Sequence, residues 1–234
     1  MTTTGLQPTA SFDATVSVVI CALNEAENLP HVLPRLPAWV DEVVLVDGHS
    51  SDGTVEVARR LRPDARVLYQ PAPGKGVALR HGVESARGDI IATIDADGET
   101  DPQDLPLFIE PLLAGFDFAK GSRFARSWRH KPPHRLLGNW AIATTCNLLY
   151  GTRFTDLCSG YNAFWRSTVA AVNFWSDDGW NYEPLIIARA LKAGLKVVEV
   201  PQTYSGRRSG RSKLPNWHQG FTALKVLARE RFSS

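Results

Sequence analysis

Several features that define other protein classes are missing from this sequence of 234 residues. No run approaches about 18 consecutive apolar residues, so the sequence predicts no transmembrane helix. The first fifteen residues are polar and rich in threonine, which does not match a secretory signal peptide. The three cysteines, Cys21, Cys146 and Cys158, are odd in number and lack the spacing of a metal site. We therefore expect reduced, buried thiols in a cytoplasmic protein.

Acidic residues are absent from two long stretches of the chain, although the net charge is only +2. Seven Lys or Arg residues lie between Asp117 and Asp156, and six more lie between Glu199 and Glu230. These stretches hold 13 of the 26 cations and none of the 24 acids. Such segregation is typical of contact with phosphates, whether of a nucleotide, a lipid headgroup or a nucleic acid. For any single cation, a solvated basic face is the alternative interpretation.

Predicted strands and helices alternate through the first half of the chain. This alternation favours an α/β fold with a mostly parallel sheet and helices on both faces. In such a fold, ligands gather at the carboxyl ends of the strands. Apolar runs predict strands over residues 16–23, 42–46, 66–69 and 90–94, and helical patterns cover 26–36, 54–62, 77–87 and 103–114.

The second half of the chain is less regular. Residues 136–152 carry no charge, but they are too few and too polar to span a bilayer. Residues 192–201 predict a helix end, a glycine turn and a final strand. We expect a disordered lead-in over 1–14, one domain over 15–213, and an amphipathic C-terminal helix appended over 214–234. That helix would place Trp217, Phe221, Leu224 and Leu227 on one face.

An acidic triplet, Asp95-Ala96-Asp97, follows the predicted strand 90–94. Side chains at positions i and i+2 of a strand point the same way, so Asp95 and Asp97 can converge on one ion. Glu99 follows at the same spacing and could complete the site, while Gly98 lets the chain turn. Hard oxygen ligands suit Mg²⁺ or Mn²⁺, which can in turn bridge a diphosphate. A solvated acidic turn is the alternative.

Polar residues also end the first two predicted strands. Asp47 is placed to accept hydrogen bonds from a base or a ribose, whereas Asp52 is better interpreted as part of a turn and helix cap. Asn24 and Glu25 end the first strand, and helix capping alone could explain Asn24. Lys75 lies between two glycines before a helix and could approach an anion, although the full phosphate-loop spacing is missing.

Taken in order, these pieces resemble glycosyltransferase family 2, which has the GT-A fold. Within that family the chain looks like the dolichyl- or polyprenyl-phosphate sugar synthases, over roughly residues 16–213. The matching positions are Asn24-Glu25, Asp47, Ser50, Asp52-Gly53-Thr54, Gly74, Gly76, Ala78, Gly88-Asp89, Asp95-Ala96-Asp97, Asp101-Pro102, Gly121-Ser122-Arg123, Asp156, Ser159-Gly160-Tyr161, Glu183, Glu199-Val200-Pro201, Arg207, Gly210 and Ser212-Lys213.

The resemblance implies a role for each matching residue. Asn24, Glu25 and Asp47 would line the nucleotide pocket, with Lys75 and Arg207 also contacting the donor. Asp95, Asp97 and Glu99 would hold Mg²⁺ or Mn²⁺ on the donor diphosphate. Four further residues would contact the acceptor phosphate or close over the donor: Arg123, Arg135, Ser212 and Lys213. The residues implied to act in the reaction itself are Asp97, Arg123, Asp156 and Lys213.

The sequence departs from the family pattern at several positions. Cys21 stands where the family usually has proline, and Gly48 replaces a common second aspartate. Gly98-Glu99 replaces the usual apolar-Gln pair, and no membrane-spanning stretch follows Lys213. The last departure leaves open whether a separate membrane protein provides an anchor.

The resemblance implies an enzyme that transfers a hexose with inversion from GDP-mannose or UDP-glucose to a polyprenyl phosphate. A second hypothesis is a soluble transferase acting on a hydroxyl, which needs a general base such as Asp156 or Glu183. A third is a nucleic-acid-binding protein, although no recognised motif is present. A catalytically inactive donor-binding module is a fourth, which intact Asp95 and Asp97 argue against.

The acid-free stretches also predict a location at the cytoplasmic face of a membrane. Trp128, Trp140, Trp217 and Phe221 accompany the cations there, and residues 136–152 could lie in the interface plane. The alternative is that 136–152 packs in the core and that the arginines contact only the donor. Replacing Arg126, Arg129 and Lys131 would distinguish the two.

Overall fold

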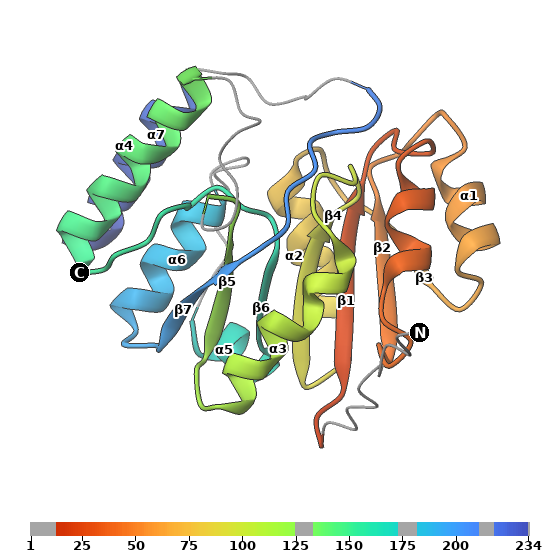
Figure 1. The fold of residues 1–234 in the computed structure, drawn as a ribbon, viewed down its shortest axis with the longest axis horizontal. Coiled ribbons are helices and arrows are strands. Elements are labelled where there is room, and N and C mark those ends of the chain that lie inside the picture. Colours follow the sequence, from red (N-terminus) through yellow and green to blue (C-terminus); the bar gives the residue numbers. More distant parts are fainter. Residues whose placement is uncertain (1–12, 125–132, 173–181, 211–217, 234) are drawn as a thin grey trace, which may run out of the picture.

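The computed structural model describes residues 13–124, 133–172, 182–210 and 218–233, which form one seven-stranded sheet between layers of helices (Figure 1). The strand order is β3-β2-β1-β4-β6-β5-β7, and β6 runs antiparallel to both of its neighbours while the other pairs are parallel. The mostly parallel sheet is therefore confirmed. The strands are β1 (Val16–Ala22), β2 (Glu42–Asp47), β3 (Arg66–Tyr69), β4 (Ile90–Asp95), β5 (Phe118–Ser122), β6 (Asn162–Trp165) and β7 (Val197–Pro201).

Helices cover both faces of the sheet, as predicted. One face packs against 3₁₀ turns, α1 and α3, and the other against α2, α4, α6 and α7. The 3₁₀ turns are η1 (Leu29–His31), η2 (Leu33–Arg35) and η3 (Pro102–Asp104), and the α-helices are α1 (Thr54–Leu61), α2 (Lys75–Ser85), α3 (Leu105–Leu113), α4 (Pro133–Tyr150), α5 (Arg166–Ala171), α6 (Tyr182–Lys192) and α7 (His218–Phe232).

The alternation of side chains along β1 divides the core into two clusters. Val18 and Ile20 face the cluster that contains Phe108 of α3, whereas Val19 faces the cluster that contains Val83 of α2. All three β1 side chains are fully buried. A central parallel strand is buried on both faces, which explains why β1 is a continuous apolar run in the sequence.

The predicted helix over 26–36 is wrong, because this segment forms η1 and η2 instead. Pro30 and Pro34 lie four residues apart, and each lacks the N–H that an α-helix needs while clashing with the carbonyl four residues earlier. Leu29 and Leu33 are nevertheless buried, so the segment still covers the sheet.

The second half contains two strands that sequence patterns missed. β5 includes Lys120 and Gly121, and β6 has only four residues, so neither has the length or the apolar run of the earlier strands. The uncharged segment 136–152 lies mostly in α4, whose Ile142 and Cys146 are buried. No helix in the described part of the chain is long and apolar enough to cross a membrane.

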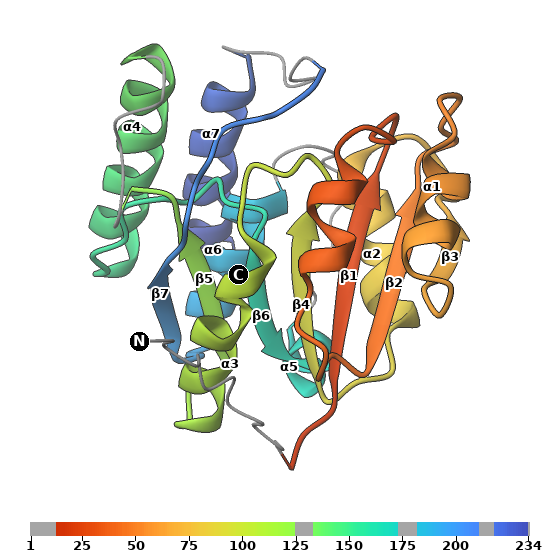
Figure 2. The same ribbon diagram turned by 45° about the vertical axis from the view of Figure 1, so that its right-hand side comes forward.

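The C-terminal helix α7 packs into the domain instead of standing apart from it. It lies beside α4 and α6, and its Leu227 is completely buried in the second core cluster (Figure 2). Leu224 is partly buried there, but Phe221 is 67% exposed, so the predicted single face of four residues does not form as expected. Trp217 and the N-terminal residues 1–12 lie outside the described residues.

Gly82 provides a test of the contact between α2 and the sheet. A Cβ atom there would lie 2.4 Å from Cγ1 of Val19 and 2.8 Å from Cγ2 of Val46. Gly82→Ala should therefore destabilise the fold by about 1–3 kcal/mol through overpacking, measured by urea denaturation. Gly138→Ala in α4 is the matched control, because nothing lies within 4 Å of that Cβ. The control should be neutral or stabilising by up to about 1 kcal/mol; equal losses in both variants would contradict the packing argument.

Candidate active site

Three neighbouring strands end at the same edge of the sheet, and two of them carry an aspartate there. β1 lies between β2 and β4, and the register places Asp47 beside Ala22 and Asp95 beside Cys21. Adjacent strands are about 4.8 Å apart, so the backbones of Asp47 and Asp95 are separated by about 10 Å. An edge of this width can bind a nucleoside near one carboxylate and a diphosphate near the other.

Each aspartate of the acidic triplet has a cation beside it. Lys75, the first residue of α2, places Nζ 2.6 Å from Oδ1 of Asp95. Arg207, in the segment after β7, places a guanidinium nitrogen 3.4 Å from Oδ2 of Asp97 and 2.9 Å from Oε1 of Glu25. Two positive charges are thus held among three carboxylates at the sheet edge.

The Lys75 ammonium also lies at the centre of a largely buried group from α2, β4 and α6. Glu183 Oε1 is 3.6 Å from Nζ, and the Tyr182 ring centroid is 5.5 Å away. Burial would lower the pKa of Lys75, but Asp95, Tyr182 and Glu183 outweigh it and raise that pKa well above its ordinary value. Burial raises the pKa of Glu183, an effect that Lys75 opposes. Lys75 therefore stays charged at neutral pH.

Gly160 lets the chain approach the Asp95 side chain closely. A Cβ atom at this position would lie 2.5 Å from Oδ2 of Asp95, and the Gly160 carbonyl accepts a hydrogen bond of 2.8 Å from Thr93 Oγ1. Asp95 is thus enclosed between Lys75 and the backbone of the segment before β6. Its glycine was visible in the sequence as part of a motif, but only the fold shows that it contacts Asp95.

Asp97 is in a less favourable environment for a negative charge. The pKa of Asp97 is raised to about 6, mainly by burial and further by the negative charges of Asp95 and Glu99. The Glu99 backbone N–H and the Arg207 guanidinium oppose this rise. A carboxylate with this surplus of negative charge gains from a nearby cation. The site is therefore electrostatically suited to bind a positive ion at Asp97.

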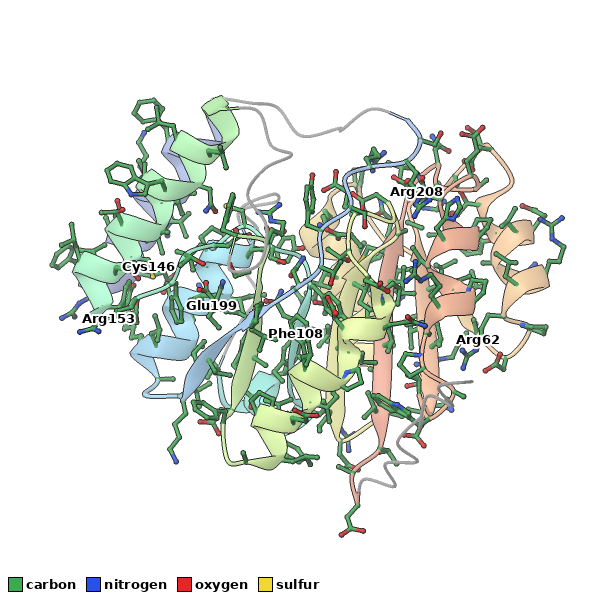
Figure 3. All side chains as sticks on the ribbon, in the orientation of Figure 1. Arg62, Phe108, Cys146, Arg153, Glu199 and Arg208 are labelled. Atoms are coloured by element: carbon green, nitrogen blue, oxygen red, sulfur yellow. The ribbon has the colours of Figure 1, made fainter. Side chains whose placement is uncertain are left out.

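The segment 202–210 crosses from β7 over the carboxyl ends of the central strands (Figures 1 and 2). Its Ser205 N–H donates to the Glu99 carbonyl at 2.9 Å, and the Ser209 carbonyl accepts from Asn28 Nδ2 at 3.3 Å. Figure 3 shows Arg208 of this segment near the upper end of β1. The first contact joins residues 106 positions apart in the chain and the second joins residues 181 positions apart, and together they bring Arg207 to Asp97.

Loops after β1 and β2 are tied to one another at the Asp47 end of the edge. Asn24, which has a left-handed backbone with φ of 51°, accepts from the Ser51 N–H at 2.8 Å. Asp47 accepts from the Ser50 N–H at 2.9 Å through Oδ2, while its buried Oδ1 has no hydrogen-bond partner among the described residues. Asp52 accepts from the backbone N–H groups of Ala26 and Thr54, which confirms a structural role for it.

Arg123 and Asp156 form a bidentate ion pair. Nε and a terminal nitrogen of Arg123 contact the two Asp156 oxygens at 2.6 and 2.9 Å, and the Cys158 N–H donates to the same carboxylate at 2.9 Å. Asp156 is completely buried, and both of its carboxylate oxygens already accept hydrogen bonds. This arrangement favours a positioning role for Asp156 over a role as general base.

A second buried ion pair was not recognised from the sequence. Lys120 of β5 is 1% exposed, and its Nζ lies 3.2 Å from Oε1 of Glu199 on β7. Glu199 also accepts from the Thr155 hydroxyl and the Asp156 N–H, while the Asp156 carbonyl accepts from Lys120. A lysine inside a short apolar strand was the available signal. The pair fixes the loop that carries Asp156.

Other predicted site residues fall outside the described structure. Ser212 and Lys213 lie in the segment 211–217, and the side chain of Arg135 at the start of α4 is likewise outside it. Glu99 is described, and it lies near enough to raise the pKa of Asp97. Among the described residues, however, no three His, Cys, Asp or Glu side chains form a metal-binding group as they stand. β4 ends at Asp95 and the chain turns from there through Gly98, whose φ is 68°, so the strand periodicity on which the spacing argument depended stops before Asp97.

The residues present still fit a divalent ion shared with a substrate. Mg²⁺ is commonly held by one or two carboxylates together with substrate phosphates, and a complete cage of protein ligands is then unnecessary. Asp95 and Asp97 offer the hard oxygen donors that such an ion prefers. The excess negative charge around Asp97 is consistent with this use.

Comparisons with known proteins identify the family of this chain. Residues 17–172 match the family described as Glycosyl transferase family 2, and the chain belongs to that family. It is an enzyme that transfers a sugar from a nucleotide sugar, and it resembles polyprenyl-phosphate sugar synthases.

Two relatives from Haloferax volcanii illustrate the resemblance. Glycosyltransferase AglJ is 33% identical over 202 residues, which cover 83% of this chain and 64% of AglJ. The dolichyl-phosphate hexose transferase is 30% identical over 217 residues, covering 92% of each chain. The present chain therefore spans less than two thirds of AglJ but nearly all of the hexose transferase.

A solved structure confirms the GT-A fold. Glucosyl-3-phosphoglycerate synthase from Mycobacterium tuberculosis, crystallised with Mn²⁺, UDP-glucose and phosphoglyceric acid, superposes with a TM-score of 0.73. The match covers 94% of this chain and 80% of the other at 24% identity. At this identity the likeness concerns the fold alone.

The raised pKa of Asp97 predicts that this residue costs stability when no cation is bound. Between pH 4 and 6 the folded chain retains a proton that the unfolded chain has lost, so stability falls as pH rises to 7. The change in pKa from 3.8 to about 6 corresponds to about 3 kcal/mol. Removing the Asp97 charge also removes its contact with Arg207, which offsets part of this gain. Asp97→Asn should therefore stabilise the chelator-treated protein by about 1–2 kcal/mol at pH 7.

Thermal denaturation at pH 7 and pH 5 measures this effect. The gain from Asp97→Asn should shrink at pH 5, while metal-dependent nucleotide binding is lost at both. Asp64→Asn is a suitable control, because its side chain is 64% exposed and paired only with Arg62 among described residues. A loss of stability in Asp97→Asn at pH 7 would show that the Arg207 ion pair dominates.

Proposed function

We propose that this enzyme transfers a hexose, with inversion, from a nucleoside-diphosphate sugar to a polyprenyl phosphate in a divalent-metal-dependent reaction. The observation that carries the proposal is the placement of Lys75 and Arg207 beside Asp95 and Asp97 at the carboxyl edge of the sheet. The carboxylates of such an arrangement can hold a metal ion, and its two cations can pair with the oxygens of a diphosphate. The similarity to the dolichyl-phosphate hexose transferase of Haloferax volcanii supports the acceptor.

In this proposal the diphosphate lies between the acidic triplet and the two cations. Asp95 and Asp97 would hold Mg²⁺ or Mn²⁺, which supplies electrostatic stabilisation of the leaving diphosphate. Lys75 is already charged and oriented by Asp95 and Glu183, so it can exchange one carboxylate contact for a phosphate oxygen. Arg207 can do the same from the opposite side, since the segment 202–210 covers the edge.

The nucleoside part would bind near β2. The buried Oδ1 of Asp47 lacks a partner, and an unsatisfied buried acceptor costs about 1–3 kcal/mol. A donor group on a base or ribose would remove this cost. Asn24 and Glu25 lie on the adjoining loop, where Asn24 orders the backbone around Ser51 and Glu25 orients Arg207. UDP-glucose and GDP-mannose are both compatible with these contacts.

A phosphate acceptor fits the chemistry of the described carboxylates. The transfer forms a bond between the anomeric carbon and an acceptor oxygen, while the bond to the β-phosphate breaks and the nucleoside diphosphate leaves with the electron pair. A phosphate monoester has a second pKa of about 6 and is mostly dianionic at pH 7, so it needs no strong base. A hydroxyl acceptor would need one. Asp156 is committed to Arg123, which leaves Glu183 for that role.

The acceptor in this proposal is a lipid, so the enzyme would work at the cytoplasmic face of a membrane. The roles expected of Arg135, Ser212 and Lys213 toward the acceptor phosphate remain part of the proposal. Arg123 would act with them by holding the Asp156 loop in place. A separate membrane protein that anchors the enzyme is compatible with the same arrangement.

A transfer assay tests the function directly. We expect product from a short, water-soluble polyprenyl phosphate with Mg²⁺ or Mn²⁺, from UDP-glucose or GDP-mannose, and none from the polyprenol of the same length. A chelator should lower the rate at least about 100-fold, since it removes the charge stabilisation of the leaving group. Glu183→Gln separates the two chemistries, because only transfer to a hydroxyl would depend on a carboxylate base. Metal-independent transfer, or equal transfer to the alcohol, would overturn the proposal.

Asp47 makes a separate prediction about donor binding. Asp47→Ala should weaken nucleoside-diphosphate binding about tenfold or more even without metal, because a buried charge-assisted hydrogen bond is lost. Isothermal calorimetry measures this change, with Asp64→Ala as a control at the opposite end of the adjoining strand. Unchanged affinity in Asp47→Ala would assign that carboxylate to the Ser50 turn alone.

A further inference from the structure

The outward sides of α4 and α7 have a composition that the proposed active site does not explain. We propose that these two helices form a docking surface for an anionic lipid bilayer. The outer helical surface, as we call it, consists of Leu137, Trp140, Leu148, Arg153, Phe221, Lys225 and Arg229. The choice of a membrane as partner rests on the proposed lipid acceptor, whereas the surface itself is defined by exposure and charge.

The α4 part of this surface is apolar and exposed. Leu137 is 62% exposed, Trp140 is 63% exposed and Leu148 is 81% exposed. Spacings of three and eleven residues place Trp140 and Leu148 on the same side of a helix as Leu137. The segment 136–152 has no charged residue, so no cation or acid of its own interrupts this stripe. Large apolar side chains exposed in a row usually mark an interaction site.

The α7 part is basic, with an aromatic residue at its start. Phe221 is 67% exposed, and Lys225 and Arg229 follow at successive spacings of four residues on the same side. Neither cation forms an ion pair with a described residue. Glu230 is the acid of α7, and its carboxylate is paired with Arg189 of α6 at 2.9 Å. The exposed side of α7 therefore carries positive charge alone.

The two helices that carry these residues are joined to each other by direct contacts. They lie next to each other, and the Tyr150 hydroxyl donates to the Leu227 carbonyl at 3.2 Å while Arg231 Nε donates to the Leu149 carbonyl at 2.9 Å. Figures 1 and 2 show both helices starting at the end of the molecule where β1 and β4 finish. Figure 3 shows Arg153 beyond the last turn of α4. A lipid held along this surface would extend toward the active-site edge.

A bilayer matches this surface better than a second copy of the chain. Apolar side chains beside lysine and arginine are typical of helices that lie in the interface of anionic membranes. In a two-fold dimer through the same surface, the cations of one copy would face those of the other, which repels. Anionic headgroups instead complement Lys225, Arg229 and Arg153. Each such cation strengthens binding about fivefold near an anionic surface.

Vesicle co-sedimentation tests the proposal with the full chain and without any sugar donor or polyprenyl phosphate. Wild type should bind phosphatidylglycerol-containing vesicles at low salt, bind pure phosphatidylcholine much less, and dissociate as salt rises. Lys225→Ser with Arg229→Ser should weaken binding on the order of 25-fold. Trp140→Ser with Phe221→Ser should weaken it at least about tenfold through lost apolar burial.

Matched controls separate this surface from general charge or hydrophobicity. Arg59→Ser with Arg60→Ser removes two exposed cations from α1, and Leu113→Ser removes a 45% exposed leucine from α3. Both controls should bind vesicles like wild type, and circular dichroism should show every variant folded. Equal losses in the controls, or wild type remaining in the supernatant at low salt, would overturn the proposal. Light scattering that shows a dimer dissolved by the Trp140 and Phe221 changes would assign the surface to a second copy instead.

Transfer to a short, water-soluble polyprenyl phosphate distinguishes this proposal from the proposed function. The surface variants should keep that activity, because none of the altered residues lies at the site. Vesicle binding without transfer by wild type would refute the proposed function and leave the docking surface intact. Transfer without vesicle binding would do the reverse.

Discussion

Like charges at the end of β4 set the main physical constraint on this molecule. Asp95 and Asp97 are two residues apart, and the negative charges of Asp95 and Glu99 add to burial in raising the pKa of Asp97. Lys75 and Arg207 offset this repulsion from two sides. Because the cations come from α2 and from the segment after β7, the site forms only when the first and last parts of the domain meet. The close approach of Gly160 to Asp95 and the crossing of residues 202–210 complete this edge of the sheet.

Two further ion pairs hold the frame around the site. Arg123–Asp156 and Lys120–Glu199 join β5, β7 and the loop before β6, and one member of each pair, Asp156 or Lys120, is almost completely buried. Such buried pairs add little net stability over apolar packing, but removing one partner is costly. Their geometry therefore specifies where the loop lies. This explains why cations in the acid-free stretches serve the interior as well as the surface.

The acid-free stretches thus divide into two groups with different uses. Lys120, Arg123 and Arg207 point inward and pair with carboxylates, while Lys225 and Arg229 point outward beside exposed apolar side chains. The first group supports binding of a phosphorylated donor, and the second supports attachment to an anionic surface. A lipid-phosphate acceptor would connect the two, since it has to reach the sheet edge from a membrane. Donor binding and membrane attachment would therefore depend on different Lys and Arg residues of the acid-free stretches.

The sequence by itself determined the parallel half of the sheet, because buried strands need continuous apolar runs and their ends need polar turns. It also determined which residues end β1, β2 and β4, and hence the acidic edge. Local patterns could not determine β6, which is short, or η1 and η2, where prolines prevent an α-helix. Only the tertiary structure decided that Asp95 pairs with Lys75, that Asp156 is occupied by Arg123, and that Arg207 reaches Asp97 from the far end of the domain. The physical reason is that strand periodicity acts over a few residues, whereas charge pairing is decided by side chains brought together from distant parts of the chain.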